Sequence, residues 1–145
     1  ILELKLDIKE ICSIGSKVGA DVNFFLHECK AADVGGVGEI VIPVEDDVPD
    51  IELIFTGEFC DTTKVYKVFR ENFWDTVDVN FTQKLAKFSS KELLNSFSPI
   101  ELNDLLRSVL VCYPNLKASA QKRVFLSGSG STFFKVLDEH DNSKK

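Results

Sequence analysis

The segment Val18-Gly19-Ala20-Asp21-Val22-Asn23-Phe24-Phe25-Leu26 sets one acidic residue between a glycine and a mainly apolar run. The residues before it predict a helix that starts at Asp7, where Asp7 and Glu10 resemble a capping box, and ends at Gly19. This helix leads the chain to Asp21. The acid needs an explanation, because the apolar residues that follow favour burial and a carboxylate does not.

Two interpretations of Asp21 stand side by side. Aspartate is a favoured N-cap, so Asp21 is expected to accept backbone N–H groups of a short helix that carries Phe24 and Phe25. Alternatively, Asp21 is a general base at the mouth of a cleft, fixed in place by the two phenylalanines packed behind it. Capping is the more common role for an isolated aspartate, so other parts of the chain must decide.

The composition describes a globular chain of one domain, or of a small domain plus part of another. It has 145 residues, of which 44% are hydrophobic. No apolar run approaches the roughly 20 residues of a membrane span, and the first residues are too charged for a signal peptide, so a cytoplasmic protein without membrane contact is predicted. The net charge is -6, with scattered Lys and Arg, which argues against a nucleic-acid partner.

The four cysteines form no C-x-x-C pair, and the two histidines complete no zinc spacing. Free thiols and no metal site are therefore predicted. The chain also begins within an apolar pattern at Ile1 and contains no Met, so we expect a fragment of a longer protein.

The first part of the chain continues as a glycine turn between two strands, the second of them over residues 39–44. The acidic segment 45–50 is the most linker-like, and a domain boundary is predicted there. A strand over residues 51–55 and a helix from Asp61 or Thr62 follow, with an apolar face of Val65, Val68, Phe69 and Phe73. Tyr66 lies off that face, where tyrosine is usually a surface residue but is also able to stack on a base.

The last part predicts two more helices and a hairpin. One helix starts at Ser89, and another at Ser98 continues for about four turns to Tyr113. Strands over residues 123–126 and 132–137 flank a glycine-serine loop, and a polar tail follows from residue 138. The fold class predicted is α+β, a sandwich with a mostly antiparallel sheet.

The loop Ser127-Gly128-Ser129-Gly130-Ser131 is the second candidate site. Its glycines allow backbone N–H groups to converge on an anion, and its serines add donors, but a flexible hairpin is an equally good interpretation. It is neither a Walker A loop nor a dinucleotide fingerprint. A nucleophilic triad has no support, because neither histidine has a convincing partner.

These segments occur together and in an order that resembles the later part of a GHMP-superfamily small-molecule kinase. The matching blocks are the Asp21 segment, Gly36-Val37-Gly38-Glu39, Gly57 with Thr62-Thr63-Lys64-Val65-Tyr66, Asn103-Asp104-Leu105, and the loop with Thr132. Within the superfamily they are most similar to the diphosphocytidyl-methylerythritol kinases of the non-mevalonate isoprenoid pathway.

The resemblance implies roles for particular residues. Asp21 corresponds to the catalytic base, while Thr62 and Tyr66 correspond to the substrate site, where the ring stacks on cytosine. Ser127, Gly128, Ser129 and Gly130 correspond to the loop that shapes the phosphate region. The implied substrates are ATP with Mg²⁺ and a cytidine-diphosphate-linked methylerythritol.

The resemblance also implies two domains and a missing half. Residues 1–48 correspond to the end of the nucleotide-binding domain, and residues 49–145 to a substrate domain with a ferredoxin-like two-layer core. The family's catalytic lysine and main ATP loop have no match here, so this chain is expected to need the N-terminal half of the same protein and to be inactive alone. The alternatives are a sibling kinase for another alcohol and a non-catalytic α+β ligand-binding module.

Overall fold

The computed structural model describes residues 6–46 and 48–137. The chain divides into two compact units, Ile1–Val48 and Pro49–Lys145, and each is described by itself. Among the described residues, no helix has the length and apolar character needed to cross a membrane. The predicted polar tail from residue 138 lies outside the described residues.

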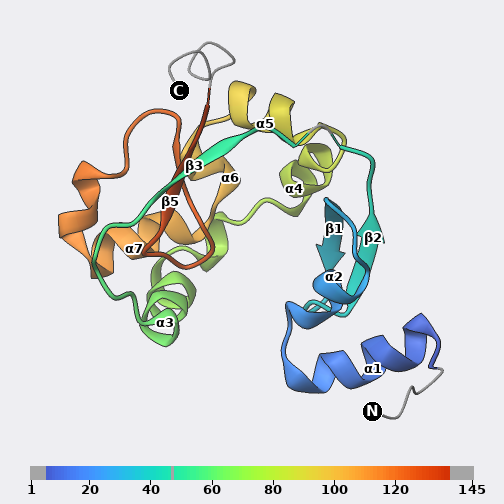
Figure 1. Cartoon of the computed structure of the whole chain (residues 1–145). Helices are drawn as coiled ribbons and strands as arrows, with labels where there is room; N and C mark the ends of the chain where they lie inside the picture. The colour runs from blue at the N-terminus through green and yellow to red at the C-terminus, as the bar shows by residue number, and fades with distance from the viewer. Residues whose placement is uncertain (1–5, 47, 138–145) are drawn as a thin grey trace. The chain divides into compact units, whose positions relative to one another are not determined.

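The first unit consists of two helices and a hairpin (Figure 1). Helix α1 spans Ile8–Val18 and α2 spans Val22–Leu26, while β1 (Ala32–Gly35) and β2 (Ile40–Pro43) pair antiparallel. The capping box of Asp7 and Glu10 is present, and Gly19 is the C-cap of α1. The predictions of the first helix and of the glycine turn between two strands are therefore confirmed.

The second unit places helices around a three-stranded antiparallel sheet with the order β3-β5-β4. Its elements, in chain order, are β3 (Ile51–Ile54), α3 (Thr62–Asn72), η1 (Trp74–Thr76), α4 (Val79–Leu85), α5 (Ser90–Ser96), α6 (Pro99–Leu102), α7 (Leu105–Cys112), η2 (Pro114–Ala118), β4 (Val124–Leu126) and β5 (Phe133–Val136). Both sheets in the described part of the chain are antiparallel, so the α+β class is confirmed. The sequence patterns did not predict η1, α4 or η2.

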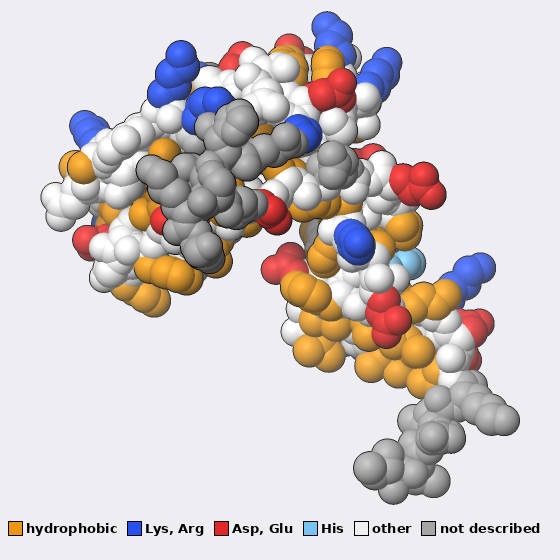
Figure 2. Space-filling view, turned by 45° about the horizontal axis from the view of Figure 1, so that its top comes forward, with side chains coloured by type: hydrophobic (Ala, Val, Ile, Leu, Met, Phe, Trp, Pro, Cys, Tyr) orange, Lys and Arg blue, Asp and Glu red, His pale blue; other side chains and the backbone are white. Residues whose placement is uncertain are grey.

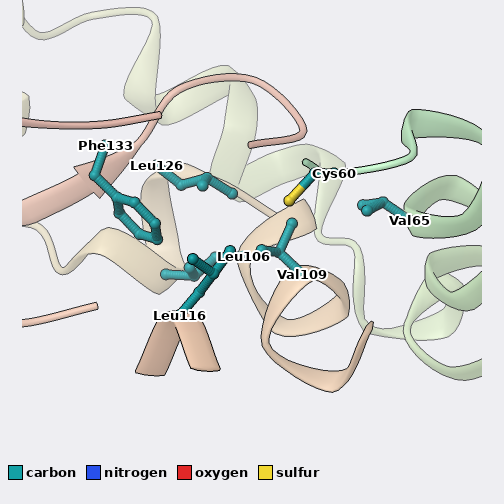
Figure 3. Close-up of a cluster of buried hydrophobic side chains, with 7 residues drawn as sticks. All are labelled: Cys60, Val65, Leu106, Val109, Leu116, Leu126 and Phe133. Carbon is teal, nitrogen blue, oxygen red and sulfur yellow. The ribbon is translucent and has the colours of Figure 1, made fainter. Parts of the chain in front are cut away.

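The core of the second unit lies between one face of its sheet and the helices α3 and α7. Ile54, Phe133 and Leu126 are in register across the three strands, so they lie on this face. The buried cluster that Figure 3 shows consists of Cys60, Val65, Leu106, Val109, Leu116, Leu126 and Phe133. This packing fixes the start of α3 and both strands that flank the glycine-serine loop.

The single helix predicted from Ser98 to Tyr113 is wrong. Ser98 and Glu101 form the expected capping box. However, α6 ends after one turn, because Asn103 adopts an extended backbone with φ -144° and ψ 102°. A separate helix, α7, begins at Leu105.

The two units differ in burial. All buried apolar side chains among the described residues belong to the second unit, whereas only Gly15 and Asn23 are buried in the first. Figure 2 shows apolar side chains spread over the visible surface of the first unit. The exposed apolar residues of this unit include Ile14, Val18, Phe25, Val34, Val37 and Ile42. Monomeric proteins rarely expose such a concentration of apolar surface unless something covers it.

Candidate functional site

Asp21 directly precedes α2, but its carboxylate does not cap the helix. Its backbone is helical, with φ -83° and ψ -10°, instead of the extended conformation typical of an N-cap. No side-chain cap hydrogen bond is formed at this helix start. The capping interpretation is therefore wrong, and the carboxylate is exposed.

The expectation that two packed phenylalanines hold Asp21 is also wrong. The rings of Phe24 and Phe25 meet edge to face at 5.4 Å, but Phe25 is 71% exposed. The Asp21 segment is instead held on one side by α1. A Cβ on Gly15 would lie 2.7 Å from Asn23 Oδ1 and 2.7 Å from Leu26 Cδ1, so only glycine allows α2 to pack this closely.

Asn23 strengthens this contact between α1 and α2. Its side chain is 1% exposed, and its Nδ2 donates to Ser16 Oγ at 2.8 Å. The hydrogen bond joins the two helices two residues after Asp21. The direction in which the chain leaves Asp21 is therefore fixed by buried packing.

On its other side the Asp21 segment is held by the Gly36–Glu39 turn of the hairpin. Gly38 has φ +102°, and a Cβ there would overlap the carbonyl oxygen of Ala20 and lie 2.7 Å from its carbonyl carbon. Within the turn, the Val37 N–H donates to Glu39 Oε2 at 2.6 Å. The structure thus brings the Gly-Val-Gly-Glu block into contact with the residue before Asp21.

The glycine-serine loop of the second unit has a defined conformation. Gly128 and Gly130 have φ +55° and +88°, in the left-handed region that favours glycine. The Gly130 N–H donates to the Ser127 carbonyl at 3.0 Å. Within the described part of the chain, the N–H groups of Gly128 and Ser129 donate to no protein acceptor, so both remain available to an anion.

The loop packs on the buried Cys60, which ends the connection between β3 and α3. A Cβ on Gly130 would lie 3.2 Å from Cys60 Sγ. Burial raises the pKa of the Cys60 thiol, and the nearby Glu58 and Cys112 raise it further. All four cysteines of the chain have free thiols. Cys60 is thus a packing residue beneath the loop, in its neutral form at physiological pH.

Hydrogen bonds join the loop to the start of α3. The hydroxyl groups of Ser129 and Thr62 lie 2.9 Å apart. Thr56 Oγ1 donates to the Ser131 carbonyl at 3.1 Å, and Ser131 Oγ donates to the Glu58 carbonyl. The structure therefore brings together two of the predicted sites, the loop and the Thr62 end of α3. Asp21 belongs to the other unit.

The helix predicted from Asp61 or Thr62 begins at Thr62, and Asp61 is its N-cap. Its carboxylate accepts from the Thr63 and Lys64 N–H groups, at 2.9 and 3.2 Å. Its own N–H donates to the Tyr113 hydroxyl at 2.8 Å, which ties the start of α3 to the end of α7.

Tyr66 lies one turn beyond Thr62 and is 45% exposed. Both residues line a surface hollow of about 540 Å³, together with Thr63, Lys67, Arg70 and Glu71. Lys67 Nζ lies 3.9 Å from Glu71 Oε1. The sequence interpretation missed Lys67 and Arg70, although their spacing from Thr63 and Tyr66 is the i, i+4 spacing of one helix face.

Comparison with known proteins identifies relatives along nearly the whole chain. No family model matches it. It is 39% identical to the 4-diphosphocytidyl-2-C-methyl-D-erythritol kinase of Sulfurimonas denitrificans over 142 residues, and 40% identical to that of Campylobacter jejuni strain 81-176 over 136 residues. The chain belongs to the same GHMP kinase family. The prediction of the family is thereby confirmed.

The alignments cover nearly all of this chain but only part of each relative. The Sulfurimonas alignment covers 97% of this chain but 53% of that protein. For the kinase of Helicobacter acinonychis, which is 34% identical, the values are 99% and 54%. The chain therefore spans about half the length of the relatives that it matches.

Proposed function

We propose that this chain is the C-terminal part of an ATP-dependent kinase that phosphorylates a hydroxyl of diphosphocytidyl-methylerythritol. The observation that carries the proposal is the 2.9 Å contact between Ser129 and Thr62. It joins a loop suited to phosphate with the helix that carries a ring suited to a base. The family relationship supports the same reaction class.

The acceptor is proposed to lie along α3. The Tyr66 ring offers a flat surface on which cytosine stacks, since every base has a π-face. Lys67 and Arg70 line the same hollow and favour the negative charge of a diphosphate. The hollow therefore combines the two interactions that a cytidine diphosphate needs.

The glycine-serine loop is proposed to stabilise phosphate charge. The available N–H groups of Gly128 and Ser129 point to this role, because positive-φ glycines let backbone donors turn toward one anion. MgATP, as a substrate, supplies the phosphoryl group and the cation that neutralises its charge. Phosphoryl transfer needs mainly positioning and electrostatic stabilisation, which is what such a loop provides.

Asp21 is proposed to accept the proton of the attacking hydroxyl. It is exposed and does not serve as a cap, so its carboxylate is available. Close packing at Gly15 and Gly38 fixes the backbone on both sides of it, which limits the positions that the carboxylate can reach. A base must be within hydrogen-bond reach of the proton that it takes, so this placement is part of its function.

The uncovered apolar surface of the first unit supports an origin from a longer protein. We propose that the upstream half, with the catalytic lysine and main ATP loop, packs on this unit and completes the nucleotide-binding domain. The second unit is then the substrate domain, and its sheet and helices are the ferredoxin-like core of that domain.

The stacking role of Tyr66 gives a direct test of the acceptor. In the complete protein, Tyr66→Ala should weaken binding of the cytidine-linked acceptor by about 1–3 kcal/mol, because the stacking surface is lost. Binding of ATP should hardly change, and Tyr66→Phe, which keeps the ring, should behave like the parent. Calorimetric titration of each ligand measures these effects.

If Tyr66→Ala binds the acceptor as tightly as the parent does, Tyr66 is an ordinary surface residue. That result would favour a sibling kinase whose alcohol substrate carries no base. An equal loss for both ligands would show that the substitution disturbs the fold instead of a stacking contact.

A further inference from the structure

Asn103 interrupts a helix that the sequence would otherwise continue. The apolar pattern runs without a break from Leu102 to Tyr113, yet the backbone of Asn103 is extended, with φ -144° and ψ 102°. Places where a chain departs from its local sequence preference tend to be functional or strained sites. The contacts of this side chain explain the departure.

The Asn103 side chain makes three hydrogen bonds to the backbone. Its Oδ1 accepts from the Leu105 N–H at 2.9 Å. Its Nδ2 donates to the Leu126 carbonyl at 3.0 Å and to the Gly128 carbonyl at 2.9 Å. The first bond caps α7 in place of Asp104, which makes no side-chain cap hydrogen bond.

The two bonds from Nδ2 anchor the glycine-serine loop where it leaves the sheet. Leu126 ends β4, and Gly128 is the first glycine of the loop. The far end of the loop is held separately, by the bonds of Thr56 and Ser131. Asn103 is therefore the side chain that fixes the near end, next to Ser129.

Few protein groups near Asn103 could replace its amide as a donor. It lies in the wall of an apolar hollow of about 350 Å³, between the sheet and the segment from α4 to α6. Among the described residues that line this hollow, Ser90 is the only other polar one. Within this hollow, the Asn103 amide is therefore the side-chain donor to the carbonyls of Leu126 and Gly128.

We propose that Asn103 is a positioning residue, which sets the glycine-serine loop so that Ser129 meets Thr62 and the loop amides face the transferred phosphate. This inference rests on the proposed function. Through Asn103, the break between α6 and α7 would determine the shape of the loop at the phosphate region. Asn103 itself contacts no reacting atom in this arrangement.

The test is Asn103→Asp in the complete protein. Aspartate has the same size and still accepts from the Leu105 N–H, but it sets carboxylate oxygens against the carbonyl oxygens of Leu126 and Gly128. The loop should move, and kcat should fall by about 100-fold, the loss expected from a misplacement of about 1 Å. The KM for the acceptor should change little, because α3 keeps its own packing. Asn115→Asp, an exposed residue of η2, adds the same charge and should leave kcat unchanged.

The pH dependence separates positioning from a general loss of stability. A protonated carboxyl at position 103 would donate one hydrogen bond again, so the ratio of variant to parent turnover should rise as the pH is lowered. Hydrogen exchange at Ser127 and Gly130, whose N–H groups donate to the Thr132 and Ser127 carbonyls, should be faster in the variant, whereas exchange in α7 should match the parent. If Asn103→Asp does not fold, Asn103→Ala, which removes both hydrogen bonds from Nδ2, serves for the kinetic and exchange measurements.

Parental kcat in a folded Asn103 variant, or unchanged exchange in the loop, would overturn the inference. If the parent protein itself does not phosphorylate the cytidine-linked acceptor, the proposed function fails, while the exchange measurement still decides whether Asn103 holds the loop.

Discussion

Asp21→Asn should lower the turnover of the complete protein by roughly 10²–10⁴-fold, because the amide cannot accept the hydroxyl proton. The fold should be unaffected, since the carboxylate of Asp21 makes no cap hydrogen bond in α2. The matched control is Asp33→Asn, which removes the same charge from an exposed position on β1 of the same unit. Steady-state kinetics with both substrates, on variants checked for folding, measures the effect.

The size of this loss also reports on the mechanism. Phosphoryl transfer passes through a loose transition state that needs little early deprotonation of the hydroxyl. If Asp21 mainly orients the hydroxyl, the loss of turnover in Asp21→Asn should therefore lie near the lower end of this range. A rate within a few-fold of the parent would remove Asp21 from the reaction altogether. Because capping is also excluded, Asp21 would then be an ordinary exposed acid.

Gly38→Ala should lower turnover by about 100-fold, because a Cβ at this position overlaps the carbonyl oxygen of Ala20 and pushes the Asp21 segment away. The matched control lies in the same turn. Gly36 also has a positive φ, of +66°, but the atoms nearest to its Cβ would be those of the Glu39 carboxylate, the end of a flexible side chain. Both substitutions carry the cost of a positive φ, about 1–3 kcal/mol.

The comparison therefore isolates the contact with Ala20. Kinetic assays together with thermal unfolding should show a lower stability and a much lower rate for Gly38→Ala than for Gly36→Ala, because only the Gly38 Cβ meets backbone atoms. Equal rates for the two variants would mean that the turn does not position Asp21. The proposed role of the Gly-Val-Gly-Glu block would then be wrong.

The sequence predicted the parts of this fold that depend on neighbouring residues. The capping boxes at Asp7, Ser89 and Ser98 and the glycine turn of the hairpin are confirmed, because each rests on residues within a few positions of one another. The end of α6 could not be predicted in the same way. Asn103 leaves the helix to bind carbonyls 23 and 25 residues away, and its own residue type is compatible with either outcome.

The candidate site shows the same limit. The loop and the Thr62 segment were recognised separately, but their contact joins residues 67 positions apart, which no local pattern reveals. The surroundings of Asp21 were predicted least well. The expected cap is absent and Phe25 is exposed. The segment is held at Gly15 and Gly38, whose small size matters only once the neighbouring backbones are in place. A glycine in a helix or a turn indicates freedom of the backbone, not the identity of its neighbour.

The most direct test of the proposed function compares this chain alone with the complete protein. Each is incubated with MgATP and diphosphocytidyl-methylerythritol, and the phosphorylated alcohol is followed by ³¹P NMR. The complete protein should form the product, whereas this chain alone should stay at the level of a blank, because the proposed ATP loop and lysine belong to the other half. Product from this chain alone would contradict the proposed division of the site, and no product from the folded complete protein would contradict the proposed function.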